Sequence, residues 1–488
     1  MDESELKKRA LSGALWKFME RIGAHLVSMV VSVILARLLT PDDYSIVGIV
    51  SIFFMFCNVF ITGGFNAALI RKKDADAVDY SSVLYISLGI ALVMYVALFF
   101  AAPWIARIYD QPLLIPVFRV MGVALLINGV KSVVCAYVSN KLQFKMFFFA
   151  TLGGTVTSAL VGIGMAVAGY GPWALVAQNL TNSLMDTVIL CAVTNFKPVL
   201  TISWNKVGAL FDYGWKIFVS SIINVIYDET LPLIIGIKFT GADLSFYTKG
   251  RAYPSMINSS INGTLSAVLF PIMSKVQDDP QAVLRYTRRF IQLSSFVVFP
   301  VMVGFAAISD NFVCLLLTDK WLPAAGFIKI FCICYMFSIV QDGNLQTIRA
   351  IGRSDLILRM EIIKKFLYLL VIVSGILLFN DPLLLAATTL INTAIATIVN
   401  TFPNRNLIGY RLRLQVKDIW CNLLTSLAMG ITVYLMNAIT IPKLLLMLLQ
   451  VLSGGVLYIA LNLLVKNPCL RYLFEALKRS KKQKQAPR

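Results

Sequence analysis

The chain has 488 residues, of which 58% are hydrophobic and only 14% carry a charge. Soluble globular proteins contain about 25% charged residues, so this composition excludes a soluble enzyme and a disordered protein. Such an apolar chain stays dispersed only in a lipid bilayer. The 44 Lys and Arg against 25 Asp and Glu give a net charge of +19. We attribute this excess to basic loops on the cytoplasmic side of a membrane and expect no nucleic-acid partner.

Apolar runs of roughly 20 residues, the length that crosses a hydrocarbon layer as a helix, follow one another along the whole chain. The ten-residue alternation typical of membrane β-barrels does not occur in the sequence. We therefore predict an all-α polytopic membrane protein. The fourteen predicted spans are 13–36, 45–70, 80–102, 114–137, 146–168, 173–194, 211–237, 250–273, 289–318, 323–345, 358–379, 382–402, 417–437 and 443–465.

Lys and Arg are concentrated in every second connection and in the C-terminal tail, as in Arg71-Lys72-Lys73. Basic residues accumulate on the cytoplasmic side of membrane proteins. This pattern predicts that both termini are cytoplasmic, which requires an even number of spans. Residues 467–488 are then a basic cytoplasmic tail, which we expect to be solvated; contact with anionic membrane lipids is the alternative.

The sequence repeats itself at a period near 200 residues. Trp16-Lys17 in the first span corresponds to Trp215-Lys216 in the seventh, and residues 39–43 correspond to 239–243. Six spans separate the copies, so the repeats have the same orientation across the membrane. We predict an N-terminal lobe of helices 1–6 (residues 1–200), a C-terminal lobe of helices 7–12 (201–410), and helices 13 and 14 (411–466).

Polar residues line one face of several predicted spans. In the seventh span the row follows intervals of four residues and consists of Lys216, Ser220, Asn224 and Asp228. Because polar and charged groups are costly in lipid, we expect these faces to surround a central water-filled cavity that binds substrate. The alternative is that the uncharged members only join neighbouring helices by hydrogen bonds. The predicted binding residues are Lys17, Arg21 and His25 in the first span, Asn58, Thr62 and Asn66 in the second, and Arg251, Asn258 and Asn262 in the eighth.

Two adjacent acids in the seventh span, Asp228 and Glu229, are the candidates for binding a coupling proton or Na⁺. The alternative is an ion pair of one of them with Lys216 or Arg251. We expect structural roles for the other charged residues within spans, and bends at Gly63-Gly64 and at Pro254. The eight cysteines include no CxxC pair, so we expect no metal site and no cofactor. The charged residues within spans for which we expect structural roles are Lys131, Asp186, Lys329 and Asp342.

Four stretches resemble the polysaccharide exporters of the Wzx and colanic-acid-exporter type, within the multidrug/oligosaccharidyl-lipid/polysaccharide flippase superfamily. These are LARLLTPDDY (35–44), GGFNAALIRKK (63–73), FYTKGRAY (246–253) and LFPIMSKVQDD (269–279), and GRSDL (352–356) continues the match. The resemblance runs from about residue 10 to 420. One departure is Ser45, where relatives usually carry Gly.

The resemblance implies a transporter, not an enzyme, that flips an undecaprenyl-pyrophosphate-linked oligosaccharide across the bacterial inner membrane by alternating access. The product would be an O-antigen, capsule or exopolysaccharide, and a polysaccharide polymerase and a chain-length regulator would be protein partners. Related lipid flippases bind pyrophosphate with cations of helices 1, 2 and 8. Here Lys17, Arg21 and Arg251 occupy helices 1 and 8, and the second span offers no cation.

Two other functions compete with this one. A drug–cation antiporter of the same superfamily would need an acidic cavity, whereas the first and eighth spans carry basic residues. A membrane polysaccharide polymerase or ligase would need a long outside loop with catalytic Arg and His. The predicted outside loops are short, and the sole histidine, His25, lies in the first span.

Overall fold

The computed structural model describes residues 3–72, 74–141, 143–194 and 196–472, in which every regular element is a helix. Each of the fourteen predicted ranges falls on one long helix or on consecutive shorter ones. Ten helical segments are long and apolar enough to cross a membrane, so the chain is a multi-pass membrane protein. The other four ranges coincide with α1 (Glu3–Leu38), α8 (Pro172–Val193), α10 (Gly241–Lys275) and α13 (Ser354–Leu378), whose crossing stays a prediction.

The contacts within the chain define two compact units, Met1–Ser245 and Phe246–Arg488. Besides α1 and α8, the first unit contains α2 (Pro41–Thr62), α3 (Phe65–Arg71), α4 (Ala77–Ile108), α5 (Leu114–Met121), α6 (Val123–Asn140), α7 (Lys145–Val167) and α9 (Trp204–Lys238). Helix α10 begins in this unit and continues in the second. The second unit also contains α11 (Pro280–Phe312), α12 (Ala324–Ala350), α13, α14 (Pro382–Leu407), α15 (Leu412–Leu435) and α16 (Lys443–Leu464).

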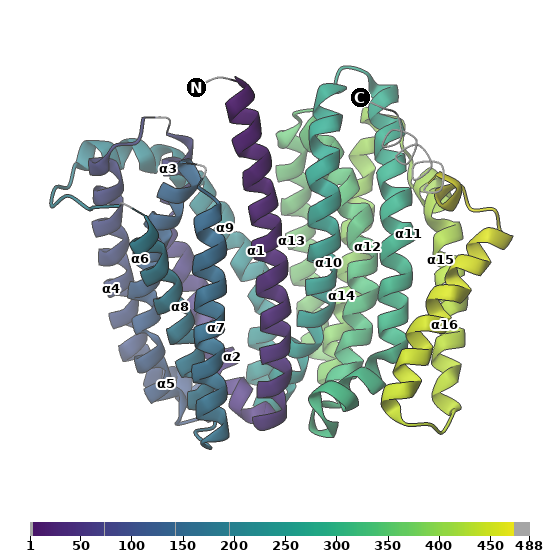
Figure 1. Cartoon of the computed structure of the whole chain (residues 1–488), viewed down its shortest axis with the longest axis horizontal. Coiled ribbons are helices and arrows are strands. Elements are labelled where there is room, and N and C mark those ends of the chain that lie inside the picture. Colours follow the sequence, from purple (N-terminus) through teal and green to yellow (C-terminus); the bar gives the residue numbers. More distant parts are fainter. Residues whose placement is uncertain (1–2, 73, 142, 195, 473–488) are drawn as a thin grey trace, which may run out of the picture. The chain divides into compact units, whose positions relative to one another are not determined.

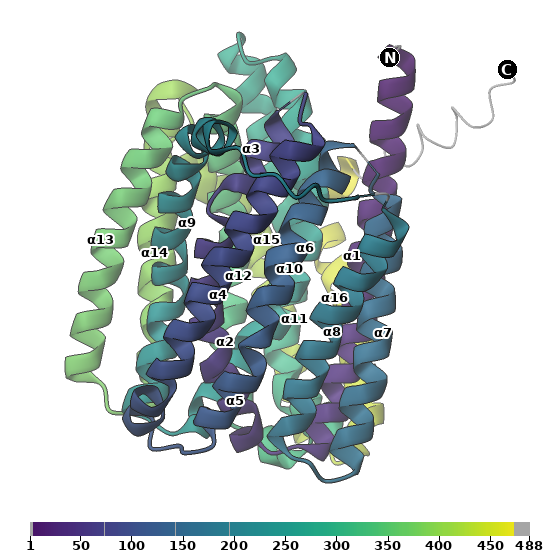
Figure 2. The same cartoon turned by 90° about the vertical axis from the view of Figure 1, so that its left-hand side faces the viewer.

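In the first unit, α1 packs along α7, and α7 packs along α8 (Figure 2). Trp16 of α1 meets Phe148 of α7 edge to face, with 5.4 Å between the ring centroids. Helix α9 packs against α2, α3 and α4. Because α9 packs against helices of the first unit, that unit extends to residue 245, whereas the second copy of the sequence repeat begins near residue 200. The six-helix lobes, which rest on the repeat, stay a prediction.

In the second unit, α15 and α16 form a hairpin beside α11 (Figure 1). The hairpin is attached by buried polar groups. Asn422 of α15 donates to Ser295 of α11 at 2.8 Å, and the hydroxyl of Tyr458 on α16 donates to the carbonyl oxygen of Phe296 at 2.8 Å. Such bonds hold helices together in lipid, where water offers no competing partner.

Candidate functional site

The polar face of α1 lies to one side of its packing face. Trp16 and Glu20 point toward α7, where the Thr151 hydroxyl donates to Glu20 at 3.3 Å. Positions 17 and 21 come directly after Trp16 and Glu20 in the sequence, and each residue turns an α-helix by about 100°. His25, further along that stripe, is half-buried. The side chains of Lys17 and Arg21 lie outside the described residues, so their role stays a prediction.

The predicted polar row of the second span is interrupted. Helix α2 ends at Thr62, and Gly63 (φ 48°) and Gly64 (φ 74°) turn the chain in the left-handed region before α3 starts at Phe65. The expectation of one continuous helix over 45–70 is therefore wrong, whereas the bend expected at the two glycines is confirmed. At Pro254, by contrast, α10 continues unbroken.

This break separates the three predicted binding residues of that span. Asn58 faces α6 and accepts from Asn128 at 3.2 Å, while the Thr62 hydroxyl bonds back to the carbonyl oxygen of Asn58 at 3.0 Å. Asn66 lies on the separate helix α3, and its side-chain oxygen is buried without a hydrogen-bond partner. The three side chains do not form one row, because the helix that would align them stops at Thr62.

Helix α9 presents an intact polar stripe. Lys216, Ser220, Asn224 and Asp228 succeed each other at intervals of four residues, and all four are exposed. The neighbouring Glu229 is buried at 9% exposure, on the side of the helix that also buries Pro232 and Gly236. The two candidate coupling acids thus have different surroundings. Only Asp228 belongs to the exposed polar face.

The polar face of α10 contacts α12. Arg251 is half-buried near the start of the stripe. One turn apart, Asn258 accepts from the Ser338 hydroxyl at 3.1 Å, and the Asn262 amide donates to the Asp342 carboxylate. Two of the predicted binding residues therefore have partners on α12, and the sequence reasoning missed Ser338. No signal in the sequence identified these partners, because a helix face does not show which distant helix packs against it.

Other charged residues within spans form two ion pairs. The Lys131 ammonium of α6 lies 2.5 Å from the Asp186 carboxylate of α8. The Lys329 ammonium of α12 lies 2.7 Å from the Asp310 carboxylate of α11. Ion pairing reduces the cost of placing these charges in a bilayer. Their arrangement agrees with the structural roles expected from the sequence.

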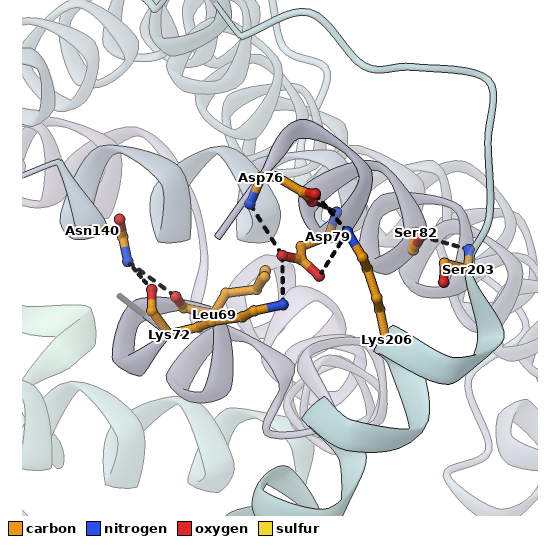
Figure 3. A network of polar contacts seen from close by, with 8 residues as sticks. All are labelled: Leu69, Lys72, Asp76, Asp79, Ser82, Asn140, Ser203 and Lys206. Atoms are coloured by element: carbon orange, nitrogen blue, oxygen red, sulfur yellow. Dashed lines mark hydrogen bonds and ion pairs between the residues drawn. The ribbon is translucent and has the colours of Figure 1, made fainter. Parts of the chain in front are cut away.

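A polar network joins α3 and α4 to the segment that begins α9 (Figure 3). Asp79, which is fully buried, accepts from the Lys72 ammonium at 2.7 Å. Asp76 accepts from Lys206 at 2.5 Å, and this bond lowers the pKa of Asp76 to about 2. The backbone N–H of Ser203 donates to Ser82 at 3.0 Å. The network thus attaches the segment that begins α9, at the start of the second repeat, to α3 and α4 of the first repeat.

The repeated motif forms the same helix cap in both copies. Thr40 and Asp43 cap α2, with the Thr40 hydroxyl donating to Asp43 at 2.7 Å and the N–H of Asp43 donating back at 3.2 Å. Thr240 and Asp243 at the start of α10 make the same two bonds at 2.6 and 3.2 Å. The Ser245 hydroxyl then donates to the carbonyl oxygen of Pro41 at 2.6 Å, which joins the two caps.

An apolar groove of about 450 Å³ lies in the second unit, mainly between α11, α15 and α16. The groove is lined in part by residues without a side chain, Gly304, Gly454 and Gly455, and in part by Met429 and Tyr458. A Cβ on Gly455 would meet no atom within 4 Å, so the wall is open at that point. Its shape and chemistry suit a hydrocarbon chain.

Residues 34–326 match the family described as "Polysaccharide biosynthesis protein". The chain belongs to this family. The match confirms the resemblance drawn from the sequence motifs. It covers the first unit beyond α1 and the beginning of the second, including α2, α9, α10 and the network around Asp79.

Two curated relatives span most of the chain. The teichuronic acid biosynthesis protein TuaB of Bacillus subtilis (strain 168) is 23% identical over 451 residues, covering 88% of this chain and 89% of TuaB. The lipopolysaccharide biosynthesis protein WzxC of Escherichia coli (strain K12) is 22% identical over 381 residues, covering 76% of each chain.

Two solved structures share the fold. The lipid II flippase MurJ in an inward closed conformation aligns with a TM-score of 0.73 at 14% identity, over 94% of this chain and 99% of MurJ. An inward-facing multidrug resistance MATE family transporter of the MOP superfamily aligns with a TM-score of 0.61 at 15% identity, over 79% of this chain and 94% of that one. These likenesses identify the fold as that of a polytopic helical transporter.

Proposed function

We propose that this family member is a flippase that moves an undecaprenyl-pyrophosphate-linked oligosaccharide across the bacterial inner membrane, with both termini in the cytoplasm. The observation that carries the proposal is the exposed polar stripe of α9, which spans thirteen residues from Lys216 to Asp228 along a membrane-length helix. A stripe of this kind needs water or a polar ligand beside it, because lipid offers it no hydrogen bonds. The hydroxyl groups of a sugar chain would form hydrogen bonds with the polar side chains of this stripe.

The names of the relatives favour this substrate class. TuaB and WzxC are both named for the biosynthesis of surface polysaccharides, and MurJ is named as a lipid II flippase. The apolar groove beside α11, α15 and α16 would hold the prenyl chain, which stays in a hydrocarbon environment while the headgroup crosses. A polymerase and a chain-length regulator would act on the exported unit.

Lys17, Arg21 and Arg251 would bind the pyrophosphate, with His25, Asn58, Thr62, Asn66, Asn258 and Asn262 as the polar surroundings of the headgroup. Pyrophosphate brings several negative charges and many acceptor oxygens, and charge-assisted hydrogen bonds to it are strong. Burying cations in a bilayer otherwise costs about 2.5–3.5 kcal/mol each. A bound anion offsets this cost.

Binding of a prenyl-pyrophosphate sugar to purified variants tests this site. Arg21→Ala and Arg251→Ala should each weaken binding by about tenfold or more, since each removes a charge-assisted bond. Arg→Lys should recover only part of the affinity, because Lys lacks the planar fork. Arg405→Ala, at an exposed position of α14, is the matched control. Unchanged affinity in both site variants would disprove the pyrophosphate site.

Asp228 and Glu229 would couple transport to a proton or Na⁺ gradient. Asp228→Asn and Glu229→Gln should abolish gradient-driven uptake while leaving exchange of bound substrate intact, since exchange needs no net cation movement. Uptake into liposomes under separately imposed H⁺ and Na⁺ gradients measures this. If both amides keep full gradient-driven uptake, the acids have structural roles.

A further inference from the structure

Asp342 lies inside α12, eight residues before its last residue Ala350, and about 12 Å from that end at the helical rise of 1.5 Å per residue. Among the described residues, no Lys or Arg lies within ion-pair distance of its carboxylate, in contrast to Asp186 and Asp310. Its hydrogen-bond partner is the Asn262 amide. A carboxylate placed in a membrane without a cation is costly and points to a function.

Asn262 adds a second, independent observation. Its Nδ2 donates to Asp342, but its Oδ1 is buried and has no hydrogen-bond partner among the described residues. An unsatisfied buried oxygen costs about 1–3 kcal/mol. Rotating the amide by half a turn would place this oxygen toward the carboxylate. That arrangement is favourable only if a proton or a metal cation lies between the two oxygens.

The turn above supplies further oxygen atoms. Ser338, one turn before Asp342, donates to Oδ1 of Asn258, which lies one turn before Asn262. Two neighbouring turns of α10 thus face two neighbouring turns of α12. The carboxylate, two amide oxygens and a hydroxyl together form a set of hard oxygen ligands, the type that hard metal cations prefer.

Few other charges act on this position. The nearest contributions come from Arg349, further along α12 and exposed, and from Lys364 of α13, whose ammonium pairs with Glu361 at 2.5 Å. On α11, the residue facing the adjacent Gly343 is the apolar Ile291. On α14, the residue facing the adjacent Gln341 is the neutral Thr397. Among the residues that the structure describes, the carboxylate therefore has no cation within ion-pair distance.

We propose that Asp342, Asn262, Asn258 and Ser338 form a binding site for one monovalent cation, either Na⁺ or a proton. With Asp342 charged and empty, the Asn262 amide donates to it. With a proton or Na⁺ on the carboxylate, the amide rotates and its Oδ1 accepts the proton or coordinates the metal. The site does not include Asp228 or Glu229. It shares Asn258 and Asn262 with the proposed surroundings of the headgroup, but cation binding can be measured without any substrate, so failure of one proposal does not entail failure of the other.

Binding of radioactive ²²Na⁺ to the purified full chain tests the metal form, and the infrared band of a protonated carboxyl group tests the proton form. Asp342→Asn should either reduce Na⁺ affinity about tenfold or more, or remove the protonated-carboxyl band. Ser338→Ala should lower Na⁺ affinity about two- to tenfold, as expected for one lost hydrogen-bonding or ligand group. Asp310→Asn, which removes a carboxylate already paired with Lys329, is the control.

A signal lost in Asp342→Asn and kept in Asp310→Asn supports the site, and the type of signal identifies the cation. The proposal is overturned if Asp342→Asn keeps both Na⁺ binding and the protonated-carboxyl band, or if Asp310→Asn loses the same signal. Thermal unfolding of each variant identifies one that has not folded. If Asp342→Asn does not fold, the Na⁺ affinity of Ser338→Ala tests the metal form instead. The pH dependence of the protonated-carboxyl band in the parent then tests the proton form. If Na⁺ affinity is unchanged in Ser338→Ala and the band does not depend on pH, the site is rejected.

Discussion

Gly64 and Gly214 pack backbone against backbone. A Cβ on Gly64 would overlap the carbonyl oxygen of Gly214, and a Cβ on Gly214 would lie 3.1 Å from the carbonyl carbon of Gly64. Gly64 lies between α2 and α3 in the first repeat, whereas α9, which carries Gly214, begins the second.

Gly214→Ala should destabilise the contact by about 1–3 kcal/mol, the range for overpacking a tight site. Thermal unfolding and polysaccharide export by cells that depend on this chain measure the effect. The matched control is Gly208→Ala on the same helix, where a Cβ would meet no atom within 4 Å. Equal melting temperatures and equal export by the two variants would show that the close contact is unimportant.

Asp79→Asn should lower the free energy of unfolding by about 1.5–3 kcal/mol, since it weakens the charge-assisted hydrogen bond from the partly exposed Lys72 to a buried carboxylate. Asp79 is fully buried and pairs with Lys72 at 2.7 Å. Asp355→Asn provides the comparison, because Asp355 and its partner Arg353 are exposed and such pairs contribute about 0–1 kcal/mol. Denaturation of both purified variants tests the difference. A smaller loss in Asp79→Asn than in Asp355→Asn contradicts it.

The pair of Asp76 and Lys206 should make stability depend on pH only under acid conditions. The hydrogen bond from Lys206 lowers the pKa of Asp76 to about 2 in the folded state, against about 3.9 in an unfolded chain. The contribution is therefore complete above about pH 4 and lost as the pH falls toward 2. Melting temperatures of the parent and of Asp76→Asn should differ by a constant amount near neutral pH and converge in acid. A gap that narrows between about pH 5 and 7 would assign the dependence to another group.

The predicted topology can be tested by labelling single cysteines from outside intact cells with an impermeant thiol reagent. Residues 278 and 405 should be shielded, because they lie in or beside the basic, predicted cytoplasmic connections. Residue 381, in the connection before α14, should react. All three positions are exposed, so burial does not explain a lack of reaction. The parent chain gives the background from its own cysteines. Labelling at 278 with none at 381 would invert the assignment.

The sequence alone predicted the helical elements closely, and even the bend at Gly63-Gly64. Hydropathy is a local property, since a run of about 20 apolar residues must leave water whatever surrounds it. The start of α9 was placed seven residues late, because Trp204, Asn205 and Lys206 do not form an apolar run. Partners in the network around Asp79 hold that polar turn in the helix.

The site was predicted less completely. Periodicity found the polar stripe of α9, since residues four apart share a helix face, and its four members are exposed together. The same reasoning failed for Asn58, Thr62 and Asn66, because it assumed a helix that the two glycines end. It also could not show that Asn258 and Asn262 face Ser338 and Asp342.

The sequence by itself determined that this is a helical membrane protein of a polysaccharide biosynthesis family with an internal repeat, since these properties follow from composition, hydropathy and short motifs. Only the tertiary structure decided which charges are neutralised by a partner. Lys131 meets Asp186 and Lys329 meets Asp310, while Asp342 meets an amide. The sequence shows which residues share a helix face, but not which distant helix packs against that face. In a bilayer, this packing determines whether a charged side chain is paired and structural or available for function.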